Sequence, residues 1–161
     1  MTTIRSRATS AIDLMQDVQI KQLSAEHISG AAELEVLCFS EPWSEKSLEL
    51  LLGNNAIGFA AVLPDGRVAA YGGMLTVLDE GQITNIATAS EFRRQGLGRC
   101  IMSALEDYAR ENGIFYLSLE VRESNLAARA LYSSLGWTEK GVRKNFYKLP
   151  TENAVVMAKK L

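Results

Sequence analysis

Two glycines and two arginines stand close together in the middle of the chain, where an apolar strand meets a helix. The segment from Arg94 to Arg99 reads Arg-Gln-Gly-Leu-Gly-Arg, and apolar residues at helical spacing follow it. The first amides of a helix have no intrahelical acceptor, and the helix dipole is positive there. Gly96 and Gly98 let a phosphate approach the backbone, and the arginines add charge. The segment is therefore a candidate phosphate-binding loop.

Three types of phosphate loop compete for this segment. A P-loop needs Lys-Ser or Lys-Thr after its glycines, and neither follows Gly98. A dinucleotide-binding fingerprint needs a third glycine, where this chain has Ile101. The third interpretation is a resemblance to the GCN5-related N-acetyltransferase (GNAT) family, whose loop holds the pyrophosphate of acetyl-CoA. Its signature [Gln/Arg]-x-x-Gly-x-[Gly/Ala] is matched by Arg93 or Arg94 together with Gly96 and Gly98. A glycine-containing loop that only caps a helix is the alternative without a ligand.

A carboxylate and a phenol follow the loop at positions where they can transfer protons. Glu120 lies near the end of an apolar strand, 114–121, in which alternation places Phe115 and Leu117 on the opposite face. Tyr132 lies on the next helix, which Ser124 or Asn125 caps. A carboxylate can accept a proton and a phenol can donate one. The structural alternatives are a strand-end ion pair for the carboxylate and a packed ring for the tyrosine.

Composition restricts the class of protein. A chain of 161 residues, 47% of them hydrophobic, predicts one globular domain. The net charge of −2 argues against general nucleic-acid binding, and no apolar run is long enough for a membrane span. The two cysteines and one histidine provide neither a metal site nor a disulfide framework, which suits a reduced cytoplasm. We expect Cys100 to be a small core residue and His27 to lie on the surface.

The hydrophobic pattern predicts the elements that position these groups. Residues 1–17 form a flexible N-terminal extension, and 18–161 form a single domain. Gly72-Gly73 inside a strand indicates a bend or a close backbone approach. The Pro42-Trp43 turn joins two helices and is either core packing or a substrate wall. The expected order is strand 18–23, helix 25–38, helix 45–52, strands 57–63, 67–78 and 82–88, helix 97–112, strand 114–121, helix 125–135, and a hairpin of strands 137–147 and 153–159.

This order predicts an α/β fold in which a mixed central sheet is flanked by about four helices. A longer motif then narrows the family. Leu119-Glu120-Val121-Arg122-Glu123-Ser124-Asn125 and the later Ala130-Leu131-Tyr132 with Gly136-Trp137 resemble the bacterial ribosomal-protein alanine N-acetyltransferases of the GNAT family. Trp137 stands where those enzymes usually have Phe. Phe146 and Asn153 also depart from the family pattern and bear on substrate preference.

The resemblance implies a role for each matched residue. Glu120 corresponds to the general base of a direct attack, and Tyr132 to the general acid. The cofactor-binding positions are Ile86, Ala87, Thr88, Arg94, Gln95, Gly96, Leu97, Gly98, Arg99 and Asn125.

The resemblance also implies a cosubstrate and an acceptor. The cosubstrate is acetyl-CoA, with no metal. The acceptor is the N-terminal alanine of a small-subunit ribosomal protein, bS18, in the cytoplasm, with no direct contact to nucleic acid or membrane. Two alternatives stay open: a GNAT enzyme acting on another protein N-terminus, a lysine or a small amine, and a non-catalytic acetyl-CoA-binding module.

Overall fold

The computed structural model describes residues 16–161, so the predicted extension over 1–17 lies almost entirely outside the described residues. Seven strands form one sheet in the order β1-β2-β3-β4-β5-β7-β6. All neighbours are antiparallel except β4 and β5, which are parallel. The strands are β1 Gln19–Gln22, β2 Ala56–Val62, β3 Val68–Val77, β4 Glu80–Thr88, β5 Tyr116–Arg122, β6 Thr138–Lys148 and β7 Thr151–Lys160. The sheet is mixed, as predicted.

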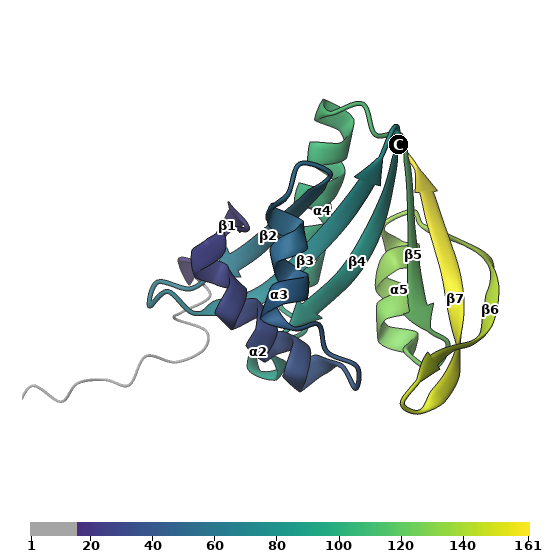
Figure 1. The fold of residues 1–161 in the computed structure, drawn as a ribbon, viewed down its shortest axis with the longest axis horizontal. Coiled ribbons are helices and arrows are strands. Elements are labelled where there is room, and N and C mark those ends of the chain that lie inside the picture. The colour runs from purple at the N-terminus through teal and green to yellow at the C-terminus, as the bar shows by residue number, and fades with distance from the viewer. Residues whose placement is uncertain (1–15) are drawn as a thin grey trace, which may run out of the picture.

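Within the part of the chain that the structure describes, four labelled α-helices cover the sheet (Figure 1). They are α2 Ile28–Cys38, α3 Glu45–Leu48, α4 Leu97–Glu111 and α5 Leu126–Ser134, with short 3-10 turns η1 Ala25–His27, η2 Glu49–Leu52 and η3 Ser90–Phe92. The helices α2 and α3 pack into one hydrophobic cluster, and α4 and α5 pack into another. None of the helices in residues 16–161 is long and apolar enough to cross a membrane.

The helix α4 follows the predicted periodicity. Leu97, Ile101 and Leu105 are buried against β2 and β3, and Tyr108 is partly buried beside them. One face of this helix therefore packs on the central strands. Its first turn lies near the end of the sheet at which β4 ends.

Only a short stretch joins β4 to β5. Three residue pairs match in register, from Glu80 opposite Tyr116 to Gln82 opposite Ser118. Beyond Gln82 the two strands separate, and Figure 1 shows β4 and β5 diverging from a meeting point near the C-terminus. The sheet is thus divided into a β1–β4 side and a β5–β7 side.

A bulge in β4 adds to this separation. Gly72 pairs with Ile86 and Met74 with Ile83, so Gly73 alone faces two residues of β4. A Cβ atom on Gly73 would lie 2.6 Å from a side-chain carbon of Leu51. The sequence predicted a bend or a close backbone approach at Gly72-Gly73; the structure has an irregular register there, and the atoms that approach both glycines most closely belong to side chains.

Two expectations about single side chains were wrong. His27 is buried, because its Nδ1 accepts a hydrogen bond from the Ser24 amide at 3.1 Å and the ring folds back over the helix start. Cys100 is exposed, because it lies on the face of α4 that is turned away from Ile101.

The strand that contains Glu120 was predicted to begin at residue 114, which is two residues too early. Ile114 is buried and Phe115 is 55% exposed, the reverse of the prediction. The reason is that β5 begins only at Tyr116, so the two preceding residues belong to a loop.

Candidate active site

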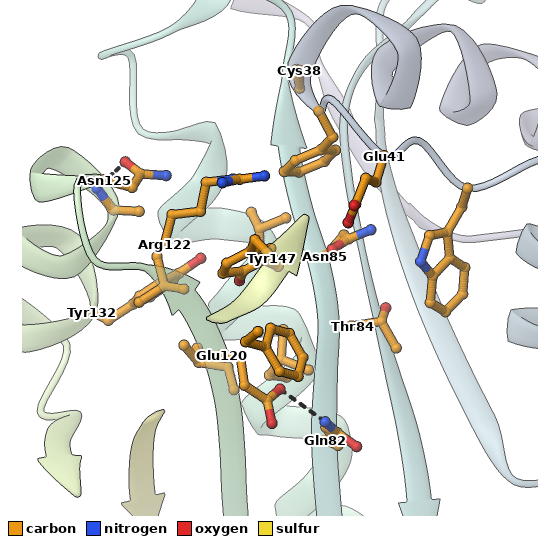
Figure 2. A pocket seen from close by; sticks show the side chains of 18 of the residues that line it. Cys38, Glu41, Gln82, Thr84, Asn85, Glu120, Arg122, Asn125, Tyr132 and Tyr147 are labelled. Carbon is orange, nitrogen blue, oxygen red and sulfur yellow. Dashed lines mark hydrogen bonds between the residues drawn. The ribbon is translucent and has the colours of Figure 1, made fainter. Parts of the chain in front are cut away.

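A cleft of about 530 Å³ opens where β4 and β5 separate. Its walls come from β4, β5, α5, the loop between α2 and α3, and the end of β6. Figure 2 shows Asn125, Tyr132 and Arg122 on one side, Glu41 and Cys38 on the other, and Glu120 beside Gln82. A long narrow ligand can therefore lie between the two separated strands.

Glu120 faces the cleft because its neighbours Leu119 and Val121 are buried on the other face of β5. Its Oε2 accepts a hydrogen bond from Gln82 Nε2 at 3.0 Å (Figure 2). Its Oε1 lies 3.5 Å from Arg143 Nε, but the Arg143 side chain is 60% exposed. An ion pair with so exposed a partner contributes little stability. The strand-end ion pair exists, and it leaves the carboxylate in the cleft wall.

Tyr132 is buried and still lines the cleft. Its ring packs at 50° against Trp137, with 6.1 Å between the centroids. Burial, and to a smaller extent the nearby Tyr147, raises its pKa to about 12. The phenol therefore keeps its proton at neutral pH, as a proton donor must. Tyr132 therefore has both features: its ring packs on a core residue, and the side chain lines the cleft.

The three predicted positions on β4 have different surroundings. Ile86 lines the cleft, whereas Ala87 is buried in the cluster beneath α2. The Thr88 carbonyl accepts a hydrogen bond from Arg93 Nε at 3.1 Å. The side chain of Ala87 is therefore directed away from the cleft, and this residue can contact a ligand there only through its backbone.

The glycine loop, residues 94–99, has backbone features that are typical of an anion-binding site. Gly96 adopts φ +86°, and Arg94 adopts φ +61°, both in the left-handed region. A Cβ atom on Gly96 would meet nothing within 4 Å, so its backbone angle, and not crowding, favours glycine there. Residues 97–99 open α4, and the first amides of a helix have no intrahelical acceptor.

The loop itself lies outside the cleft walls, beyond the end of β4. Arg99 Nη2 donates to Ser134 Oγ of α5 at 3.1 Å, and Gln95 Nε2 donates to the Glu91 carbonyl at 3.3 Å. Gly98 faces Leu131 of the same helix α5. The loop and α5 are therefore neighbours, and the loop continues the line of the cleft.

Asn125 has a structural task besides its place in the cleft wall. Its Oδ1 accepts a hydrogen bond from the Ala128 amide at 3.2 Å and so caps α5, which is the helix that carries Tyr132. The predicted cap is confirmed at Asn125.

Sequence reasoning missed Arg122, although it lies within the long motif. Its guanidinium stacks on Tyr147 at 4.3 Å, pairs with Glu152 at 3.0 Å, and donates to Ser40 Oγ at 3.0 Å. It therefore connects β5 with the β6–β7 turn and with the α2–α3 loop. No local pattern identifies this role, because the partners are 25 to 82 residues away in the chain, as with Ser40 at 82.

Gln82 and Glu35 were missed for the same reason. Gln82 bonds Glu120 from another strand, and Glu35 is fully buried although the helix pattern gave it no special place. Of the other residues in the cleft, Trp43 lines the wall and also packs on the core, so the core-packing interpretation of its turn is confirmed and the substrate wall stays a prediction. Within residues 16–161, no group of three or more His, Cys, Asp and Glu side chains is placed to hold a metal ion.

Comparison with known proteins assigns the family. Residues 28–137 match the model of the acetyltransferase (GNAT) family. The chain is 38% identical over 143 residues to the [ribosomal protein bS18]-alanine N-acetyltransferase of Escherichia coli K12, covering 86% of this chain and 95% of that one. It is 36% identical over 139 residues to the putative enzyme of the same name from Bacillus subtilis, covering 86% and 92%.

A solved structure agrees with these relatives. The crystal structure of the Escherichia coli ribosomal-protein alanine N-acetyltransferase superposes with a TM-score of 0.81 at 36% identity, covering 89% of this chain and 93% of that one. The chain therefore belongs to the acetyltransferase (GNAT) family, among the relatives of the ribosomal-protein alanine N-acetyltransferases, and it is an N-acetyltransferase.

Proposed function

We propose that this enzyme transfers the acetyl group of acetyl-CoA to the α-amine of the N-terminal alanine of ribosomal protein bS18 in the cytoplasm. The observation that carries the proposal is the single cleft between β4 and β5, which contains both Glu120 and Tyr132 in its walls. The names of the relatives support the acceptor.

In this proposal acetyl-CoA lies along β4. Its pyrophosphate meets the loop Arg94–Arg99, and its pantetheine arm passes Ile86, Ala87 and Thr88 toward the point where the strands separate. Backbone N–H groups of this stretch polarise the thioester carbonyl and stabilise the tetrahedral oxyanion. Asn125, which caps α5 on the other side of the cleft, contacts the cofactor there.

The protons move between the substrates and two side chains. Glu120 takes a proton from the attacking amine, directly or through a water molecule. The amine nitrogen bonds to the acetyl carbon, the carbon–sulfur bond breaks, and Tyr132 gives its proton to the leaving thiolate. The pKa of about 12 keeps Tyr132 protonated until that step. No acetyl-enzyme forms.

An N-terminal amine suits this chemistry better than a lysine. The pKa of an α-amine is roughly 7.7 to 8.0, whereas that of a lysine side chain is about 10.4. A much larger fraction of the α-amine is therefore neutral at pH 7, and a carboxylate is a sufficient base for it.

The test is release of thiol from acetyl-CoA in the presence of a short peptide copied from the N-terminus of bS18. The same peptide with a blocked N-terminus is the control. Turnover with the free amine alone is expected. Equal turnover with a blocked peptide that contains lysine would point to side-chain acetylation, and binding of acetyl-CoA without turnover on any amine would point to a non-catalytic module.

One residue favours a test of other acceptors. Phe146, which departs from the family pattern, lines the cleft, whereas Asn153 bonds the Asn145 amide within the hairpin at 3.0 Å. A competition assay with other N-termini, lysine peptides and small amines measures how far the acceptor range extends.

A further inference from the structure

A second carboxylate, Glu35 of α2, is fully buried at 0% exposure and takes no part in the proton transfers described above. It accepts hydrogen bonds from Tyr71 Oη, from Asn85 Nδ2 at 2.8 Å and from the Trp43 amide at 3.1 Å. None of the Lys, Arg and His side chains in residues 16–161 forms a salt bridge with it. A buried carboxylate with only neutral donors is costly unless each bond is well formed.

The donors of Glu35 come from different parts of the site. Asn85 belongs to the bulge of β4, and Trp43 belongs to the loop between α2 and α3. Both residues line the cleft. Tyr71 lies behind them on β3, opposite Ala87. One carboxylate therefore ties two walls of the cleft to each other and to the central sheet.

The rest of the α2–α3 loop depends on this attachment. It contributes Phe39, Ser40, Glu41 and Trp43 to the cleft wall. The Ser40 hydroxyl bonds Arg122 across the cleft, but that contact is exposed. Water competes with the exposed hydrogen bond between Arg122 and Ser40, whereas the Glu35 side chain is fully buried. The bond between Glu35 and the backbone amide of Trp43 is therefore the stronger attachment of the loop.

We propose that Glu35 is a positioning residue: through the Trp43 amide and the Asn85 side chain it holds the α2–α3 loop at a set distance from the β4 bulge, and this loop is the wall of the cleft against which the acceptor binds. This proposal rests on the acetyl transfer proposed above. Glu35 has no hydrogen bond or ion pair with Glu120 or Tyr132, so it acts on where the acceptor binds and leaves proton transfer to those two residues.

The chain offers a matched control, because a second buried carboxylate is not among the residues that line the cleft. Glu106 of α4 accepts hydrogen bonds from Trp137 Nε1 at 3.1 Å and from Lys159 Nζ at 3.0 Å. It is 7% exposed and lines no part of the cleft. Glu35→Gln and Glu106→Gln therefore remove the same chemical group from two buried networks. Only the Glu35 network contains residues of the α2–α3 loop and of the β4 bulge, whereas the Glu106 network meets the cleft through Trp137, which packs on Tyr132.

The experiment compares the steady-state kinetics of the two variants with an alanine-starting peptide. Glu35→Gln is expected to raise the acceptor KM about tenfold, since an amide cannot serve all three donors and one of them loses its bond. The acetyl-CoA KM and the shape of the pH profile are expected to stay unchanged. Glu106→Gln is expected to lower the melting temperature and to leave the acceptor KM unchanged. Equal acceptor KM values in both variants would overturn the proposal.

Tyr71→Phe separates positioning from stability within the same network. It removes the bond to β3 and keeps both bonds that reach the cleft, so it should lower the melting temperature with little change in the acceptor KM. If Glu35→Gln does not fold, Glu35→Asp keeps the charge but shortens the reach to Trp43 and Asn85. The same rise in the acceptor KM is expected, and its absence would contradict the proposal.

A readout that needs no acceptor distinguishes failure of this proposal from failure of the proposed function. Hydrogen exchange of the Trp43 amide should become faster in Glu35→Gln and stay slow in Glu106→Gln. If the wild-type enzyme acetylates no alanine peptide but Trp43 exchange responds, the acceptor assignment fails and the positioning role stands. If Trp43 exchange does not respond, the positioning role fails whatever the acceptor.

Discussion

The two sides of the cleft contain different kinds of chemical group. The β4 side offers the backbone of Ile86 to Thr88, neutral side chains such as Gln82 and Asn85, and then the glycine loop. The β5 side offers the two side chains that are proposed to transfer protons, Glu120 on the strand and Tyr132 on α5. The comparison suggests a division of work in which one side binds acetyl-CoA and the other moves protons. It also explains why the strands must separate, since paired strands would leave no room for a ligand between them.

The largest effect is expected from the β5 side. Glu120→Gln and Tyr132→Phe should each lower kcat about a hundredfold or more, because each removes one partner of a proton transfer. Both substitutions keep side-chain size, so acetyl-CoA should bind to both variants with nearly wild-type affinity in calorimetry. If both variants kept wild-type turnover, the assignment of base and acid would be wrong.

Substitutions in the glycine loop beyond β4 are expected to weaken acetyl-CoA binding and to leave kcat nearly unchanged. Gly96→Ala places a Cβ atom on a backbone at φ +86°, which costs roughly 1–2 kcal/mol. The acetyl-CoA KM should rise about tenfold or less as the loop shifts, while kcat changes little.

Gly66→Ala is the control for this substitution. Gly66, at φ +89°, also has nothing within 4 Å of an added Cβ atom, but it lies in the β2–β3 turn. It should show a similar loss of melting temperature with no change in the acetyl-CoA KM. A similar rise in both variants would show that the effect is one of stability and not of phosphate binding.

A smaller effect is expected at the end of β6, which closes the β5 side of the cleft. Phe146 is 43% exposed and packs edge-on against Tyr147, with 5.0 Å between the ring centroids. Phe146→Ala should raise the acceptor KM a few-fold, about the effect of losing one half-buried aromatic contact. The exposed Val142 of the same strand, outside the cleft, gives the control Val142→Ala, whose kinetics should match the wild type.

The smallest effect is expected from pH. Because the pKa of Tyr132 is raised, this group is fully protonated below about pH 10 and loses its proton only near 12. The value of kcat/KM for an alanine peptide should rise as the amine loses its proton, near pH 8, and should show no fall from Tyr132 between pH 8 and 10. A fall in that range that disappears in Tyr132→Phe would mean that the phenol ionises early.

The same pKa shift predicts a change of stability. In the unfolded chain the tyrosines ionise near pH 10, whereas Tyr132 and Tyr147 in the folded protein do so near 12. The contribution of these groups is complete below pH 10 and is lost as the pH rises toward 12. The free energy of unfolding, measured by urea titration, should therefore fall over this interval.

Much of the fold follows from local patterns. The period of α4 and the cap at Asn125 depend on residues a few positions apart, so each could be predicted. The glycine loop and the long motif around Glu120 are also continuous in sequence. The order of the elements and the positions of the two proposed catalytic residues were therefore within reach of the sequence.

What could not be predicted depends on residues that meet only after folding. Glu35 has an ordinary place in a helix, and its burial arises because Asn85 and Tyr71, 50 and 36 residues away, lie on the strands against which α2 packs. Trp137 stands where the relatives usually have Phe, and its indole N–H needs a hydrogen-bond partner. It donates to Glu106 of α4, which is 31 residues away in the chain.

By itself, the sequence determined which elements form, in which order they follow, and which family motifs they contain, because periodicity, caps and turns act over a few residues. Only the tertiary structure decided where β4 separates from β5, that Gln82 reaches Glu120, and that Glu35 joins two walls of the cleft. The physical reason is that strand pairing and the burial of a charge depend on partners that are far apart in the chain and close in space.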